Sequence, residues 1–143
     1  MKVIHNIRIE AFLYPTEDPK KVRKALDLVL PEKSLIKNEE LESYDGPAIE
    51  KLSYFSDKPG DIRKILDAIV SGLSKEDKRE IIETLDDRID ETGSLYLRFD
   101  KQSACKGALA LIYHGDVIKI AIKIASYPVT LNNVKHNAKI LFE

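Results

Sequence analysis

The sequence has one cysteine, one methionine and no tryptophan among its 143 residues. A single cysteine excludes a disulfide within the chain, and such cysteine-poor chains are typical of reducing compartments, so we expect a cytoplasmic protein. The apolar run at residues 108–113 is too short to span a bilayer, and no apolar block follows Lys2 as it would in a signal peptide. We therefore expect no membrane association.

The common motifs of nucleotide-binding proteins and hydrolases are also missing: there is no GxxxxGK[ST], GxSxG or GxGxxG. The three histidines, His5, His114 and His136, are far apart in the sequence and form no HxxxH or HxH pair. Cys105 has no cysteine partner and no base at a short spacing. Zinc binding and a cysteine nucleophile are both disfavoured, so we expect no catalytic residue, no metal and no cofactor.

Acidic residues gather at Asp86, Asp87, Asp90 and Glu91. If this segment is helical, Asp86 and Asp90 lie one turn apart, a spacing that can hold magnesium for phosphoryl transfer. A solvated helix face balanced by Arg88 explains the same residues and is the more common case. A metal-dependent enzyme acting on RNA or nucleotides is therefore the least favoured function.

Charge is nearly balanced over the whole chain, with a net charge of −1, but it is unevenly distributed. Residues 94–143 hold 7 Lys and Arg against 3 Asp and Glu, which gives +4 and leaves −5 for residues 1–93. This asymmetry indicates a surface that faces a polyanion, or it reflects a strand-rich half that carries fewer acids. The sequence leaves both explanations open.

The length predicts one domain, residues 1–143, which is large enough to bury a core. Alternating apolar residues predict strands at 3–14, 34–42, 48–55, 95–99, 108–113 and 117–125. Helical spacing predicts helices that begin after Asp18, after Asp57 and after Ser74, and a last helix at 132–142. This order lacks regular strand–helix alternation. It predicts an α+β fold in which helices pack on one face of a largely antiparallel or mixed sheet.

Three local expectations follow from the same patterns. In the first strand, His5 lies on the apolar face. The helix after Ser74 continues to Thr92–Gly93. Residues 114–116 form a tight turn that pairs 108–113 with 117–125 as a hairpin, and 117–125 presents an exposed strand edge.

The most informative segment is residues 95–107. Its alternating strand stops at Asp100, which can cap a short helical turn that ends at Gly107. Backbone N–H groups at a helix start favour negative charge, so this corner is a candidate anion site. The anion can be an RNA phosphate, a carboxylate of a partner, or Asp100 itself.

The remaining candidates for binding are basic and aromatic. Arg98, Lys119 and Lys123 are expected to project from one sheet face. Other candidates are expected beside that face or at its edge: Lys101, Gln102, Lys106, Tyr44, Tyr54 and Tyr96. Single-stranded RNA is bound through phosphate contacts and through stacking of bases on aromatic or Arg side chains. A solvated sheet face whose lysines discourage edge pairing explains the same residues.

Several segments together resemble an archaeal family described as predicted RNA-binding proteins or predicted exosome subunits. The matching segments, in the family's order, are His5–Ala11 leading into Thr16–Val22, Arg88–Glu91, Leu95–Gln102 and Ser126–Pro128. The Arg-Phe-Asp-Lys-Gln letters at 98–102 are the most specific of them. Where the family typically has His-Tyr-Gly-Asn-Pro, this chain has Ser-Tyr-Asp-Gly-Pro at 43–47.

The resemblance implies a fold similar to the large-subunit ribosomal protein that contacts 5S rRNA. It also implies frequent homodimers and no known catalytic residues. The expected function is therefore a non-catalytic RNA-binding module, associated with RNA processing or with exosome subunits. The alternative is a protein-interaction or assembly module that makes no direct contact with RNA.

Overall fold

Five strands form a single antiparallel sheet in the order β2-β3-β1-β5-β4. The computed structural model describes residues 3–32, 34–41 and 46–143. The strands are β1 (Ile4–Leu13), β2 (Lys37–Leu41), β3 (Ile49–Ser56), β4 (Ser94–Asp100) and β5 (Val117–Ile124). The helices are α1 (Pro19–Asp27), α2 (Pro59–Gly72), α3 (Lys75–Glu83), α4 (Leu85–Arg88), α5 (Lys101–Cys105) and α6 (Leu131–Phe142).

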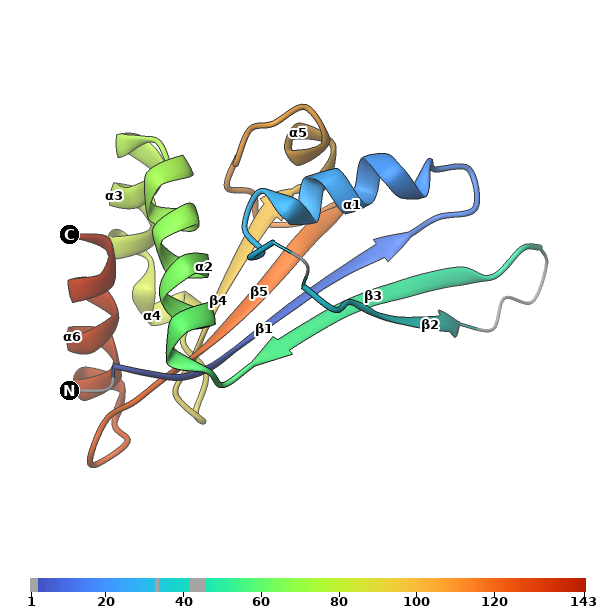
Figure 1. The fold of residues 1–143 in the computed structure, drawn as a ribbon. Helices are drawn as coiled ribbons and strands as arrows, with labels where there is room; N and C mark the ends of the chain where they lie inside the picture. The colour runs from blue at the N-terminus through green and yellow to red at the C-terminus, as the bar shows by residue number, and fades with distance from the viewer. Residues whose placement is uncertain (1–2, 33, 42–45) are drawn as a thin grey trace.

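The helices cover one face of this sheet, as Figure 1 shows, and the predicted α+β fold is confirmed. The helices cover only one face because alternate side chains of a strand point to opposite faces of the sheet, and only one of these faces is apolar. On β5, Ile118, Ile120, Ile122 and Ile124 are at most 1% exposed, whereas the residues between them are half-buried. Burying each such side chain stabilises the fold by roughly 1.5–3 kcal/mol.

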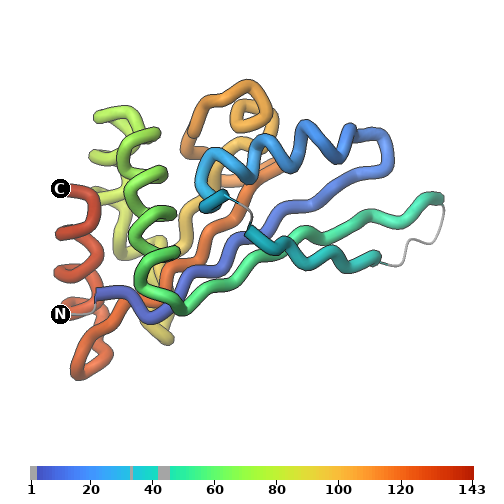
Figure 2. Tube along the Cα trace, viewed as in Figure 1, coloured from blue at the N-terminus to red at the C-terminus, as the bar shows by residue number. Residues whose placement is uncertain are grey.

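Helices α1, α2 and α3 begin where the sequence predicts, and α6 begins one residue earlier than predicted, at Leu131. Asp18 caps α1 by accepting a hydrogen bond from the Lys20 N–H, and Ser74 caps α3 through the Asp77 N–H. The longest described helix, α2, has 14 residues, and no described helix is long and apolar enough to cross a membrane. The start of β1 lies beside α6, which Figure 2 shows most simply.

The helix expected from Ser74 to Thr92 is interrupted. It divides at Thr84 into α3 and α4, and α4 ends at Arg88. The Thr84 hydroxyl donates to the Glu80 carbonyl, and Thr84 has a non-helical backbone (φ −113°, ψ 19°). Asp90 therefore lies outside the helix.

The predicted hairpin is wrong. Residues 108–113 form no strand, and only Leu111 makes an isolated bridge to Phe99. β5 pairs instead with β1 on one side and with β4 on the other. The segment 117–125 is therefore interior to the sheet rather than an exposed edge. The exposed strand is β2, which pairs with β3 and has four of its five residues exposed.

His5 also departs from its expected place. An irregularity in the pairing of β1 with β5 falls between Ile4 and Asn6. It shifts the alternation by one residue, so Ile4 is buried and His5 is exposed. A bulge of this kind cannot be inferred from alternation alone, because it depends on the partner strand.

Candidate nucleic-acid interface

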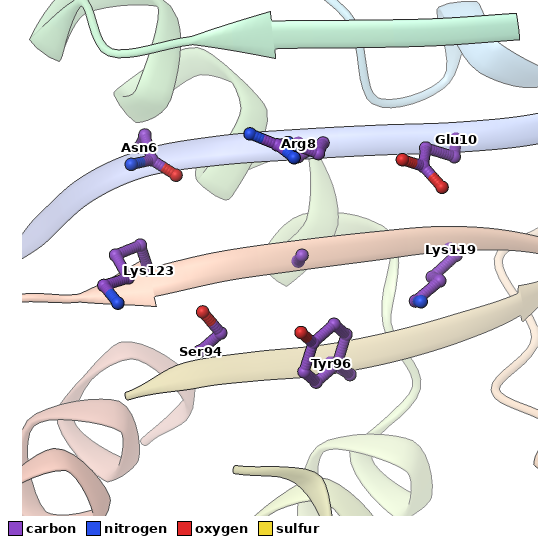
Figure 3. Close-up of a pocket in the computed structure, with 8 residues that line it drawn as sticks. Asn6, Arg8, Glu10, Ser94, Tyr96, Lys119 and Lys123 are labelled. Atoms are coloured by element: carbon purple, nitrogen blue, oxygen red, sulfur yellow. The ribbon is translucent and has the colours of Figure 1, made fainter. Parts of the chain in front are cut away.

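The face of the sheet opposite the helices carries a group of polar side chains on three adjacent strands, β1, β5 and β4. Figure 3 shows Asn6, Arg8 and Glu10 on β1, Lys119 and Lys123 on β5, and Ser94 and Tyr96 on β4. We call this group, with Ala121 and Arg98, the open face. Strand register brings its members together: Ala121 lies opposite both Arg8 and Tyr96, and Lys119 lies opposite both Glu10 and Arg98.

A hollow of about 380 Å³ lies over the open face. Ala121 lies between Arg8 and Tyr96 in the strand register. Its single methyl group fills little of the space between these two long side chains. Small-molecule sites have volumes of roughly 300–1,000 Å³, so this hollow is at the lower end of that range.

The open face is cationic. It carries Arg8, Arg98, Lys119 and Lys123 against one carboxylate, Glu10. None of these four cations forms an ion pair with a residue that the structure describes. The Lys123 ammonium donates to the Thr92 carbonyl, which leaves its charge uncompensated. Such a surface attracts anions from solution.

Two aromatic rings accompany these cations. The Lys119 ammonium lies 5.0 Å from the centre of the Tyr96 ring, and the Arg8 guanidinium lies 5.4 Å from that of Phe55. Phe55 lies opposite Arg8 on β3 and is 51% exposed. Rings of this kind offer flat surfaces on which a base can stack.

The orientation of Tyr96 is set by Asp90. The Tyr96 hydroxyl donates to Asp90 Oδ2 at 2.8 Å, and this hydrogen bond, with partial burial, raises the pKa of Tyr96. Partial burial alone would raise the pKa of Asp90. The hydrogen bonds that Asp90 accepts from Thr92, Ser94 and Tyr96 outweigh burial and lower its pKa to about 2. Asp90 is therefore a structural carboxylate at the edge of the open face.

Lys101 requires a correction, because it lies in the interior of the protein. Its side chain is 0% exposed, and its ammonium lies 2.6 Å from Glu17 Oε1, 2.6 Å from the Phe12 carbonyl oxygen and 3.2 Å from Asp116 Oδ1. A buried ammonium that already has three oxygen partners is not available to a phosphate. Gln102 belongs to the same cluster, since its amide donates to Glu17 and Asp116.

The candidate anion corner is occupied from within the chain. Asp100 Oδ2 accepts from the Ser103 N–H and from the Ser103 hydroxyl, so Asp100 fills the start of the five-residue helix α5. Lys106 is exposed at the end of α5. Because α5 packs against α1 on the helical side, Lys106 is separated from the open face.

The described aromatic candidates also lie on opposite faces of the sheet. Tyr96 lies on the open face, whereas Tyr54 is 9% exposed and lies opposite Ile9 on the face that the helices cover. Tyr44 lies outside the described residues. Arg8 and Phe55 were not among the sequence candidates. Alternation places Arg8 on the outward side of its strand, but only the pairing of β1 with β5 brings it to Lys119 and Tyr96.

The geometry gives little support to metal-dependent chemistry or to a cysteine nucleophile. Asp86 forms an ion pair with Lys135 at 2.7 Å, and Asp90 is committed to its own turn. Within residues 3–32, 34–41 and 46–143, no three His, Cys, Asp or Glu residues are arranged to hold a metal. Burial raises the pKa of the Cys105 thiol, which disfavours the reactive thiolate.

The histidines are less dispersed in space than in sequence. His5 and His136 line one hollow of about 520 Å³ between the start of β1 and α6, together with Asn133 and Asn137. The amides of both Asn residues donate to backbone carbonyls of the segment that joins β5 to α6. His114 lies apart from them, in the turn before β5.

Comparison with known proteins finds a matching family, a similar sequence and similar solved structures. A family described as RNA binding matches residues 6–124. An RNA-binding protein of Pyrococcus abyssi is 39% identical over 129 residues, which are 87% of this chain and 84% of that protein. Two solved archaeal structures share the fold. A protein of Archaeoglobus fulgidus has a TM-score of 0.86 and 31% identity, and covers 96% of this chain and 99% of its own. A protein of Methanothermobacter thermautotrophicus has a TM-score of 0.83 and 32% identity, with coverages of 99% and 100%.

Proposed function

The chain belongs to the family described as RNA binding, and from this premise we propose that it binds RNA across the open face of its sheet. The observation that carries the proposal is the hollow over Ala121. There Arg8, Lys119 and Lys123 surround one half-buried aromatic ring, that of Tyr96. Cations and an aromatic ring within one hollow are the combination that single-stranded nucleic acid requires.

In this proposal the cations contact phosphates and the rings contact bases. The RNA backbone contacts the four cations of the open face, Arg8, Arg98, Lys119 and Lys123. An extended single-stranded RNA can pass over them, and their charges are not compensated by ion pairs with residues that the structure describes. Tyr96 and Phe55 lie on either side of Arg8 and Ala121 in the register, three strand spacings apart. At about 4.8 Å per spacing, they are far enough apart to contact different nucleotides. No catalytic role is proposed for any of these residues.

The test is a fluorescence-anisotropy titration with short single-stranded RNA at two salt concentrations. We expect the affinity of the native chain to fall steeply as salt rises, because phosphate contacts release counterions. The double variant Arg8→Ala and Lys119→Ala should bind more weakly at both salt concentrations. Lys75→Ala, which removes an exposed cation from α3 on the helical side, is the matched control and should bind as the native chain does. Absence of binding even at low salt would refute the proposal.

The finer expectations from the resemblance belong to the same proposal. We propose that residues 1–143 act as one RNA-binding domain in the cytoplasm, that the domain works with exosome subunits, and that it forms homodimers. We also propose that the fold is similar to that of the ribosomal protein that contacts 5S rRNA. Affinity purification before and after nuclease treatment tests the exosome association, and sedimentation tests the dimer.

The protein-interaction alternative is favoured by one observation, the exposed strand β2. Its exposed residues include Glu39 and Glu40, which point to opposite faces of the sheet, and its outer edge is not paired with any strand of the described chain. In this alternative a protein partner is recovered in fixed stoichiometry after nuclease treatment, and short RNA does not bind. That pair of results would replace the RNA proposal.

A further inference from the structure

One member of the open face does not suit a surface that only binds phosphate. Glu10 lies on β1 opposite Lys119 of β5 and Ser53 of β3, it forms an ion pair with the diagonal neighbour Lys51, and it lines the hollow over Ala121. A carboxylate at this place weakens the attraction of the face for a polyanion. Its presence therefore points to a role other than phosphate binding.

Within the part of the chain that the structure describes, the Glu10 carboxylate accepts no side-chain hydrogen bond and has the Lys51 ammonium as its ion-pair partner. Its side chain is 30% exposed, and Oε1 lies 3.6 Å from the Lys51 ammonium, beyond ordinary hydrogen-bond length. None of the side-chain hydrogen bonds among the described residues ends on Glu10. An ionised carboxylate accepts only, and it can take two parallel N–H donors at once.

The hollow next to Glu10 suits one flat group. It is bordered by the Arg8 side chain on β1 and by the Tyr96 ring on β4, with Ala121 of β5 between them. Lys119 lies over one face of Tyr96 in this structure, and its flexible stem allows the ammonium to move towards a phosphate when a base takes its place. The volume of the hollow, about 380 Å³, matches a single nucleotide better than a longer ligand.

We propose that this hollow binds one guanine base of a single-stranded RNA and that Glu10 is the residue that determines its specificity. The inference rests on the proposed function. Guanine has two adjacent N–H donors on its Watson–Crick edge, at N1 and N2, and they match the two oxygens of a carboxylate. Adenine and cytosine offer one amino group beside a ring-nitrogen acceptor, and uracil offers one N–H between two carbonyl oxygens that a carboxylate repels.

The experiment compares oligouridine with the same oligonucleotide carrying one central guanosine, adenosine or cytidine, in anisotropy titrations at constant salt. We expect the guanosine-containing RNA to bind roughly tenfold more tightly than oligouridine, as a good bidentate contact provides. Adenosine and cytidine should give smaller gains. Equal affinity for all four RNAs would refute the guanine site and leave the proposed function intact, whereas no binding to any of them would refute the proposed function.

Two variants separate specificity from general electrostatics. Glu10→Gln should abolish the preference for guanosine while binding to oligouridine stays the same or improves, because a repelling charge is removed. The matched control is Glu39→Gln, which neutralises an acid of the same sheet face on β2, outside the hollow. It should raise the affinity for both RNAs equally. If Glu10→Gln also raises both affinities equally, Glu10 is an electrostatic residue and the inference is wrong.

A third variant tests the hollow itself. Ala121→Leu fills the space between Arg8 and Tyr96 without changing any charge. It should remove the guanosine preference while the salt dependence of binding is retained. Ala121→Val, which suits a strand and adds less volume, serves the same purpose if the leucine variant unfolds. Retention of the preference in a folded variant would place the base elsewhere and refute the site.

Discussion

The Lys101 ammonium lies 2.6 Å from Glu17 Oε1, although 84 residues separate the two in the sequence. The same ammonium contacts the Phe12 carbonyl near the end of β1 and Asp116 immediately before β5. Lys101 itself follows β4 directly. One buried cation therefore joins the ends of the three strands that form the open face.

Lys101→Ala is expected to lower the free energy of unfolding by about 3 kcal/mol, because it leaves Glu17 and Asp116 without their cation. Urea denaturation at neutral pH measures this loss. Lys106→Ala, which removes an exposed lysine from the end of the same short helix, should change stability by less than about 0.5 kcal/mol. An equally small effect at Lys101 would contradict its structural role.

The cost of Lys101→Ala should also depend on pH. Burial raises the pKa of Glu17, but hydrogen bonds from Lys101 and Tyr14 outweigh it, so the native pKa is lowered. A carboxyl whose native pKa is lowered stabilises the fold at pH values above its ordinary pKa. That stabilisation is lost as the pH falls from the ordinary pKa through the lower native pKa. The difference in unfolding free energy between native and variant chains should therefore shrink from pH 7 to pH 4. A constant difference would show that Glu17 is not coupled to Lys101.

Asp90→Asn should flatten the acid limb of the stability profile. The native pKa of Asp90 is about 2, below its ordinary value of 3.8, so its contribution is present above about pH 4 and is lost between pH 4 and pH 2. Melting temperatures recorded across this interval should fall less steeply for the variant than for the native chain. Parallel profiles would show that Asp90 keeps an ordinary pKa in the folded state.

At Tyr96, two substitutions separate stacking from hydrogen bonding. Tyr96→Phe removes the hydrogen bond to Asp90 and keeps the ring, whereas Tyr96→Leu removes the ring as well. RNA affinity should change little in the first and fall by about 1–3 kcal/mol in the second, the usual value of a base stacked on an aromatic side chain. Anisotropy titrations measure both, and an equal loss in the two variants would assign the effect to the hydroxyl.

For Arg8 and Lys119, the prediction concerns the salt dependence of RNA binding. Each phosphate contact that is removed should reduce the slope of log affinity against log salt by about 1. Arg8→Ala and Lys119→Ala should therefore each lower the slope, and the double variant should lower it by about 2. Weaker binding with an unchanged slope would indicate that these side chains contact bases instead.

Much of the fold follows from local patterns. The alternation in 117–125 predicts the strand and its buried isoleucines, and Ser74 and Asp100 cap the helices that they precede. The prediction of an α+β fold is confirmed. It could be made from the sequence because helix caps and hydrophobic periodicity depend on residues that are close in sequence. The errors at 108–113 and at His5 arise where pairing with a distant strand overrides the local pattern.

Apart from His5, the sequence by itself determined which side chains of β1 and β5 face outward, and it determined where α1, α2 and α3 begin, because these features depend on neighbours a few residues away. Only the tertiary structure decided that β5 lies between β1 and β4, that Arg8 and Tyr96 flank Ala121, and that Lys101 is buried rather than exposed. Strand order and register depend on contacts between residues far apart in the chain. Arg98 and Lys101 are only three residues apart, yet a short turn sends one to the open face and the other into the core.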